Sequence, residues 1–423
     1  MQTASAVDPH WPTLLQRLSG VLDLDASARA SGALRRRRAV ADGATLLRLA
    51  LAHGPGGLSL RSAAGWAGVS GVAALSDVAL RKRLRGAADW LGQVAGALLR
   101  TAAKSVAGPA SPTGRRLRLV DGSISHPGAA GTTWRVHAAY DPGVGRFTDL
   151  ELTDAHGAES FARVQLTAGE VAVGDRGYAR PVSLHHVLTL GADFVVRVGW
   201  SSLRLTTPDG EPLAWNPIYV SLARGDVTER EVVVTRHSRG PGRRGKPLFP
   251  ARLVVMRQHA AAGRRALQAT QRGHMRRHTG AAMQPLTATS AEYLMLLTSL
   301  PVEAAPAAEV LATYRLRWQV ELAFKRLKSG LGMHRLLARD ERLARSWLFA
   351  HPILALLIED AAGEVLDAPP CAPDRPCAAH LTLAAPCHAA RHPARSRAAH
   401  GRHCRPKVCC HRTHPPHLRP ATA

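Results

Sequence analysis

The chain has 423 residues, of which 56 are lysine or arginine and 31 are aspartate or glutamate, so its formal net charge at pH 7 is +25. This excess of positive charge indicates a polyanionic partner, and the length suffices for two or three domains. No run of about 18 apolar residues and no secretory signal pattern occurs, which excludes membrane-spanning and secreted classes and predicts a cytoplasmic protein. All six cysteines lie between Cys371 and Cys410, so residues 1–370 cannot depend on disulfides.

Residues 1–108 are expected to form a small helical domain, for which DNA binding is one of two interpretations. Apolar residues recur with helical spacing in four stretches: Trp11–Leu24, Ala39–His53, Ser59–Ala67 and Leu80–Ala103. Within this domain, Leu58–Arg85 contains two short helical patterns, a Gly/Ser turn and a basic end. That pattern fits a helix-turn-helix DNA reader and also an ordinary helical hairpin. The run Arg35–Arg38 fits either phosphate contacts or an exposed helix start.

Residues 109–365 alternate between strand and helix patterns, which predicts an α/β domain. Three segments predict a set of antiparallel strands: Arg116–Val120, Thr132–Tyr140 and Arg146–Thr153. The first of them runs directly into Asp121, so this aspartate is expected at the carboxyl end of a strand. After a short helical piece at Glu159–Leu166, a second apolar strand ends on Asp175.

The chain after Asp175 predicts a β-α-β unit with a parallel strand pair, because a helix at Pro181–Leu190 precedes a buried strand at Asp193–Val198. A smaller β-rich insertion is then expected at about residues 200–290. Its predicted strands are Ile218–Leu222, Glu229–Thr235 and Ala251–Arg257. Its two basic connections, which either follow a phosphate backbone or extend into solvent, are Arg236–Lys246 and Arg264–His278. A final strand at Glu292–Ser299 and a helix that begins at Pro306 complete the domain.

Residues 314–328, YRLRWQVELAFKRLK, predict one helix with two contrasting faces. At about 100° per residue, one face carries four functional groups: Tyr314, Arg317, Glu321 and Lys328. The opposite side carries four packing residues: Leu316, Val320, Ala323 and Leu327. A lone glutamate among cations is usually part of a solvated ion pair, so this stretch by itself does not identify a site.

Three acidic residues are candidate metal ligands and catalytic groups: Asp121, Asp175 and Glu321. Carboxylates brought together bind divalent cations, and two ions roughly 3.5–4 Å apart activate an attacking oxygen while they stabilise a leaving one. This is chemistry for phosphodiester substrates, and it agrees with the basic charge of the chain. Three other acids near strand ends remain alternatives: Asp141, Asp149 and Asp154.

These residues resemble a known family, the DDE transposases of the IS4 group of bacterial insertion sequences. The spacing within Tyr314–Lys328 is similar to the Y-x2-R-x3-E-x6-K signature of that family. Leu119–Ser123 and Gly174–Tyr178 are similar to its first and second aspartate motifs, and a β-rich insertion before the glutamate also fits. The resemblance spans roughly Arg35–Asp360.

The resemblance implies an RNase H-like fold of the retroviral integrase type, in which Asp121, Asp175 and Glu321 hold two Mg²⁺ ions, with Mn²⁺ as a possible substitute. It also implies that water attacks the phosphodiester at the element's end and that the freed 3′-OH then attacks the opposite strand or target DNA. The partners would be terminal inverted repeats and target DNA, and the assembly a homodimer in a synaptic complex.

The same resemblance implies roles for DNA-binding residues. Arg317 and Lys328 would contact phosphates near the cleaved strand, and Tyr314 would hydrogen-bond one. Tyr293 matches a position where the family places an aromatic ring that stacks on a flipped base, and a tyrosine of the core is the alternative. Two aromatic residues that flank the functional face are expected to pack inside: Trp318 and Phe324.

Residues 366–423 depart from the family pattern, because helices that mediate pairing are expected there and a Cys/His/Pro-rich basic tail stands instead. The tail has too little apolar surface to offset its ordering entropy, so we expect a disordered or frameshifted segment. Its cysteine spacing lacks the paired C-x-x-C pattern of a zinc site. Two functions therefore remain: an active transposase, or a catalytically inactive DNA-binding remnant that occupies element ends.

Overall fold

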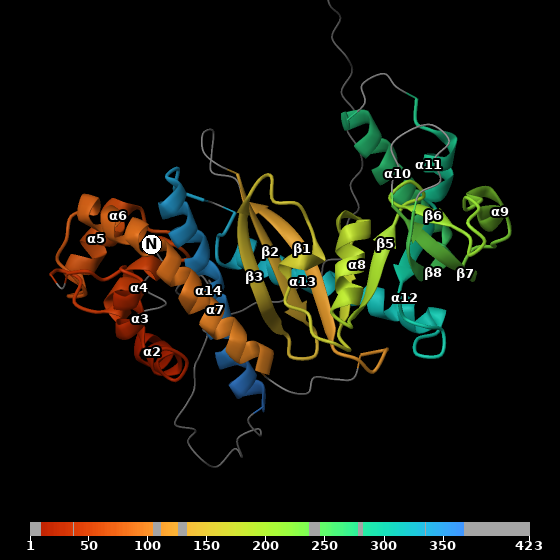
Figure 1. Ribbon diagram of the computed structural model, residues 1–423. Helices are drawn as coiled ribbons and strands as arrows, with labels where there is room; N and C mark the ends of the chain where they lie inside the picture. The colour runs from red at the N-terminus through yellow and green to blue at the C-terminus, as the bar shows by residue number, and fades with distance from the viewer. Residues whose placement is uncertain are drawn as a thin grey trace, which may run out of the picture. The chain divides into compact units, whose positions relative to one another are not determined.

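The computed structural model describes residues 10–367 apart from residues 37, 105–110, 126–132, 237–245, 278–281 and 335 (Figure 1). The predicted tail, from residue 368 on, and almost all of the connection Arg236–Lys246 lie outside the described residues. In these ranges, no helix combines the length and the apolar character that a membrane span requires. The fold is mixed α/β, with helices first and a nine-stranded sheet after them.

The N-terminal part is helical, as predicted. Its described helices are α2 Trp11–Ser19, α3 Leu24–Ala30, α4 Gly43–His53, α5 Leu60–Val69, α6 Asp77–Gly86 and α7 Ala88–Lys104. Short polar side chains start several of them: Asp42 accepts a hydrogen bond from the Thr45 amide at 2.7 Å, and Ser76 accepts one from the Ala79 amide at 3.2 Å. Such caps satisfy backbone donors that have no partner inside the helix.

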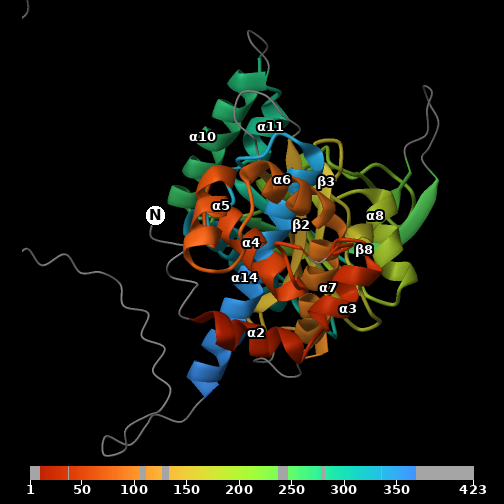
Figure 2. The same cartoon turned by 90° about the vertical axis from the view of Figure 1, so that its left-hand side faces the viewer.

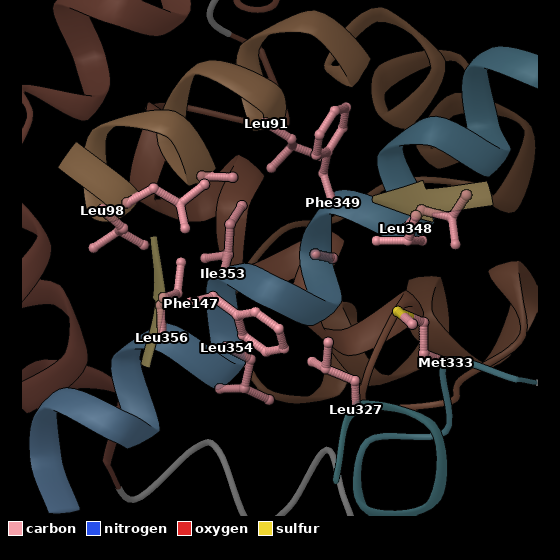
Figure 3. Packing of buried hydrophobic residues seen from close by; sticks show 14 of the residues in the cluster. Leu91, Leu98, Phe147, Leu327, Met333, Leu348, Phe349, Ile353, Leu354 and Leu356 are labelled. Carbon is pink, nitrogen blue, oxygen red and sulfur yellow. The ribbon is translucent and has the colours of Figure 1, made fainter. Parts of the chain in front are cut away.

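The last described helix, α14 (Glu341–Asp367), packs on these N-terminal helices. It runs along α7 and also contacts α4 and α6 (Figure 2). Leu91 and Leu98 of α7 lie close to Phe349 and Ile353 of α14 in the shared apolar core (Figure 3). All four side chains are at most 9% exposed, so the two ends of the described chain are joined by buried apolar surface.

The sheet contains β1 Leu117–Ser125, β2 Trp134–Asp141, β3 Arg146–Asp154, β4 Val171–Gly174, β5 Asp193–Val198, β6 Arg204–Thr206, β7 Val227–Thr235, β8 Pro247–Arg257 and β9 Tyr293–Thr298. Their order is β3-β2-β1-β4-β5-β9-β8-β7-β6. β4 pairs in parallel with β1 on one side and with β5 on the other, and all the other pairs are antiparallel. The predicted antiparallel set and parallel pair are confirmed, and the β-rich insertion extends the same sheet because β8 pairs with β9.

The remaining elements connect the strands and cover the sheet. They are η2 Phe161–Arg163, η3 Arg176–Tyr178, α8 Pro181–Thr189, α9 Trp215–Val220, α10 Ala260–Arg277, α11 Pro285–Ser290, α12 Ala307–Arg315, α13 Trp318–Lys325 and η4 Arg326–Gly330. Residues alternate between two cores along each strand: Leu119 belongs to the core that includes α13 and α14, whereas Val120 belongs to the core that includes α8.

Two expectations in the sheet region are wrong. Asp121 does not end a strand: β1 continues to Ser125, because β2 offers partners from Ala138, opposite Asp121, to Trp134, opposite Ser125. The segment Ile218–Leu222 is not a strand, since most of it belongs to α9. Pro217 lies in the first turn of that helix, where a missing N–H costs nothing.

Two expectations about helices also need correction. The basic segment Arg264–His278 lies largely within helix α10, because its alanine, glutamine and arginine residues are good helix formers. Residues 314–328 are not one helix. At the junction of α12 and α13, the amides of Arg317 and Val320 bond to carbonyls three residues earlier, which tightens the turn, and a π-helical turn follows at Arg326–Gly330.

Candidate active site

Two strands bring the predicted aspartates together. β1 and β4 run parallel with Leu119 opposite Val173, and Asp121 and Asp175 each lie two residues further along. Side chains two residues apart in extended backbone project to the same side, so the two aspartates are neighbours on one face of the sheet, where β4 ends.

Asp175 follows β4 directly, as the sequence predicts, and caps the 3₁₀ turn η3. Its Oδ1 accepts a hydrogen bond from the backbone amide of Gly177 at 2.8 Å. This bond fixes the carboxylate at the end of the strand instead of leaving it free in a loop.

Asp121 shows that the three candidate carboxylates interact. Burial raises the pKa of Asp121 to about 6, while the bond from the Gly122 amide and the charge of Arg317 oppose this rise. The negative charges of Asp175 and Glu321 raise the pKa further. Like charges act on one another in this way only when they lie close together.

Glu321 is presented by α13, which packs on β1 and β2 through Val320 and Phe324. Its side chain is 52% exposed, and its Oε1 accepts a hydrogen bond from Arg317 Nη2. Glu321, Asp121 and Lys328 line one cavity of about 280 Å³. A carboxylate from the helix, another from the sheet and an ammonium group therefore face the same space.

The other residues of the signature lie around the interrupted helix. The guanidinium carbon of Arg317 lies 5.6 Å from the ring centre of Tyr314, in the geometry of a cation–π contact. Lys328 belongs to the π-helical turn after α13. The predicted packing stripe is confirmed, since Val320, Ala323 and Leu327 are at most 1% exposed and Leu316 packs against the same core.

The aromatic residues beside this region differ from one another. Phe324 is 3% exposed, as predicted, but the prediction for Trp318 is wrong because this side chain is 54% exposed. Tyr293 is 4% exposed, stacks on Tyr219 with ring centres 4.4 Å apart, and donates a hydrogen bond from its hydroxyl to the Tyr219 carbonyl at 2.8 Å. In this structure Tyr293 is part of the core.

Sequence reasoning missed a fourth carboxylate, Glu159. A Cβ placed on Gly177 would lie 1.8 Å from Glu159 Oε2, and one on Gly122 would lie 3.2 Å from Oε1. Burial and the charge of Asp175 raise the pKa of Glu159, whose Oε1 lies 3.7 Å from Arg135 Nη1. Because Gly122 and Gly177 have no side chain, the Glu159 carboxylate can lie this close to the backbone beside both aspartates. These two glycines are the only signal in the sequence for the position of Glu159.

The side chains around Asp121 supply oxygen atoms that suit a divalent cation. No group of three or more Asp, Glu, His or Cys side chains within the described ranges is arranged to hold a metal ion. The carboxylate of Glu321 is bonded to Arg317. The donor chemistry nevertheless fits, because hard oxygen ligands repel one another at Asp121 and a cation would relieve that repulsion.

Comparisons with known proteins point to one family. A family model described as "Transposase DDE domain" matches residues 112–358. Similar proteins include the putative transposase InsL for insertion sequence element IS186A of Escherichia coli strain K12 and the transposase for insertion sequence element IS421 of Escherichia coli. Each is 43% identical, over 363 and 364 residues respectively, which covers 85% of this chain and 96% of each relative.

A mixed sheet that carries interacting carboxylates beside cations is typical of enzymes that act on phosphodiesters. The chain belongs to the DDE transposase family. It is an enzyme and a transposase of insertion sequence elements, related to those of IS186 and IS421.

Proposed function

We propose that this transposase binds the terminal inverted repeats of its insertion sequence, cleaves the DNA strand there and transfers the freed end to target DNA. The observation that carries the proposal is geometric: Asp121 and Asp175 follow paired positions of the parallel strands β1 and β4, and Glu321 lines the same cavity as Asp121. We assign the enzyme to the IS4 group and its sheet to the RNase H-like fold. The parallel strands β1, β4 and β5, flanked by the antiparallel β2 and β3, support that assignment.

The proposed cofactor is a pair of Mg²⁺ ions, for which Mn²⁺ would substitute, held by oxygen atoms of Asp121, Asp175 and Glu321. When bound, the ions would supply an activated attacking oxygen and neutralise charge on the leaving oxygen. Oε1 of Glu321 accepts the hydrogen bond from Arg317, so Oε2 is the oxygen that would hold a cation without loss of this bond. A bound phosphate would compete with Glu321 for the Arg317 guanidinium.

The proposed DNA-binding residues beside the carboxylates are Arg317, Lys328 and Tyr314. Lys328 lines the cavity that Asp121 also lines, so a phosphate held by its ammonium group would lie next to the acidic residues. For Tyr293, base stacking requires that the ring leave its place on Tyr219 in the core. We retain this role as a proposal that depends on such a movement.

A second set of cations supports the proposed DNA-binding role of the N-terminal helices. The segment after α3 and helix α6 contribute Arg35, Lys82, Arg83 and Arg85 to one hollow of about 410 Å³. Arg83 Nη2 also donates a hydrogen bond to the carbonyl of Arg36 at 3.0 Å, which ties the two basic segments together. A surface with this charge suits phosphates, whether or not a helix also reads bases.

We further propose a domain division at residues 1–108, 109–365 and 366–423, a homodimer within a synaptic complex, and a bacterial cytoplasmic location. The dimer would place one copy of the site at each element end.

The function is tested with duplexes that carry the ends of the element. We expect strand nicking that requires Mg²⁺ or Mn²⁺ and stops with a chelator, followed by hairpinned ends. Salt-dependent binding to these ends without nicking at any metal concentration would contradict the proposal and favour the inactive DNA-binding remnant.

A further inference from the structure

Helix α10 is strongly basic and contains no acidic residue to balance its arginines. Its 18 residues, Ala260–Arg277, include no aspartate or glutamate. The helix carries five arginines: Arg264, Arg265, Arg272, Arg276 and Arg277. It lies next to α11 in the insertion between β8 and β9 (Figure 1).

The helix has an inner and an outer side. Gly263 is buried and Ala266, Leu267 and Thr270 are half-buried at helical spacing, so this side faces the protein. The outer side consists of exposed residues, among them Arg264, Gln268, Arg272, Met275 and Arg276. The cations are thus gathered on the surface that is free to meet a partner.

No carboxylate in the described part of the chain pairs with Arg264, Arg265 or Arg272. The acid beside the start of the helix is Glu292, whose Cβ lies 3.7 Å from a Cβ placed on Gly263. Its Oε2 already accepts hydrogen bonds from Nη2 of Arg224 at 3.4 Å and from Nη2 of Arg257 at 3.5 Å.

Arg272 and Arg276 are four residues apart, a spacing at which like charges on a helix repel one another. A polyanion would turn the repulsion into attraction. Since the chain is a transposase, the polyanion with matching charge is DNA.

We propose that the outer side of α10 binds phosphates of double-stranded DNA, as a contact surface separate from the carboxylate cavity. Arg264 and Arg276 are 12 residues apart, about 18 Å along a helix, which matches roughly five base pairs of duplex. The contacts are electrostatic, so α10 contributes affinity and orientation without reading sequence. The inference rests on the proposed function in that the DNA is the transposase's own substrate.

The test is a salt titration of duplex binding by the full chain with Arg264→Gln and Arg272→Gln combined. Glutamine is a good helix former, so α10 should persist, which circular dichroism checks. Loss of two phosphate contacts should reduce the slope of log K against log salt concentration by about 1.8. The factor by which Kd rises between 50 and 200 mM salt should therefore be about 12-fold smaller in the variant than in wild type. The loss should be equal on an end duplex and an unrelated duplex.

The matched control removes the same charge from arginines that already have carboxylate partners and lie outside the insertion, Arg29→Gln with Arg163→Gln. We expect a slope close to wild type for the control and rescue by Arg264→Lys with Arg272→Lys. An unchanged slope in the glutamine variant, or an equal loss in the control, would overturn the proposal.

Nicking at saturating protein distinguishes this proposal from the proposed function. It should survive in the α10 glutamine variant, because the carboxylates are intact. If wild type itself fails to nick, the proposed function fails while the salt slopes still decide the role of α10.

Discussion

Arg317 donates a hydrogen bond from Nη2 to Oε1 of Glu321, one helical turn further along the chain. The pair places a cation on the carboxylate that the proposed metal site requires. Arg317 is therefore expected to have two roles, as a partner of Glu321 without metal and as a phosphate ligand with metal and DNA.

The first prediction follows from that competition. Arg317→Gln should bind Mn²⁺ about twofold more tightly, because an ion pair of this kind contributes only about 0.3–0.5 kcal/mol. Cleavage of end duplexes should nevertheless fall, since a phosphate contact is lost. Calorimetric Mn²⁺ titration and a nicking assay measure the two effects. Arg315→Gln removes the same charge from an exposed neighbour, and equal behaviour of the two variants would argue against the pairing.

The second prediction concerns the glycine after the second aspartate. A Cβ on Gly177 would lie 1.8 Å from Glu159 Oε2, so Gly177→Ala must displace Glu159 or the backbone that bonds Asp175. We expect nicking about tenfold slower, because the contacted oxygen ends a flexible side chain that can move, although its carboxylate lies beside Asp175. Gly65→Ala, where a Cβ meets open space, is the control.

Combining Gly177→Ala with Glu159→Gly removes the clash. Partial recovery of nicking would attribute the defect to that contact. No recovery, together with an unchanged thermal midpoint, would show that Gly177 acts in another way.

The third prediction addresses Lys328, which lines the cavity with Asp121 and Glu321. Lys328→Ala should weaken binding of end duplexes and lower the salt slope by about 0.9, the value for one phosphate contact, while Mn²⁺ binding is retained. Lys325→Ala removes the same charge from the same cavity and should have a smaller effect. Equal effects of the two substitutions would contradict a specific phosphate contact by Lys328 and would show that only its positive charge matters.

The fourth prediction is a pH dependence of stability. Burial raises the pKa of Glu359 in α14 to about 7 from its usual value of 4.5, although Arg146 and Arg326 oppose the shift. The folded protein therefore holds this proton at higher pH than the unfolded chain. Its stabilising contribution is complete below about 4.5 and is lost as pH rises through about 7.

Glu359→Gln should accordingly raise the free energy of unfolding by about 1–2 kcal/mol at pH 8, with no gain near pH 4.5. Urea unfolding at both pH values measures it. Glu341→Gln, at the exposed start of the same helix, should change stability by less than about 0.5 kcal/mol. A gain that is the same at both pH values would contradict the assignment of the pKa.

Local patterns predicted much of the site. Asp175 follows a buried strand, and Val320, Ala323 and Leu327 form the packing stripe that the spacing predicts. Both features are set by residues close together in the sequence, and hydrophobic periodicity reports on such local patterns.

Features set by distant neighbours were not predicted. The extension of β1 beyond Asp121 depends on pairing with β2, and the position of Glu159 depends on the absence of side chains at two glycines. Tertiary contacts decide such positions. Trp318 was expected to pack because its ring is large and apolar, but at about 100° per residue it lies opposite the packing stripe, and it is 54% exposed.

Single-turnover nicking of end duplexes in Mg²⁺ by wild type, Asp121→Asn, Asp175→Asn and Glu321→Gln tests the catalytic site most directly. We expect nicking by wild type alone, with end binding retained by all four proteins and Mn²⁺ affinity lowered in the three variants. Nicking at the wild-type rate by any one of these variants would contradict the claim that the three carboxylates form the catalytic site.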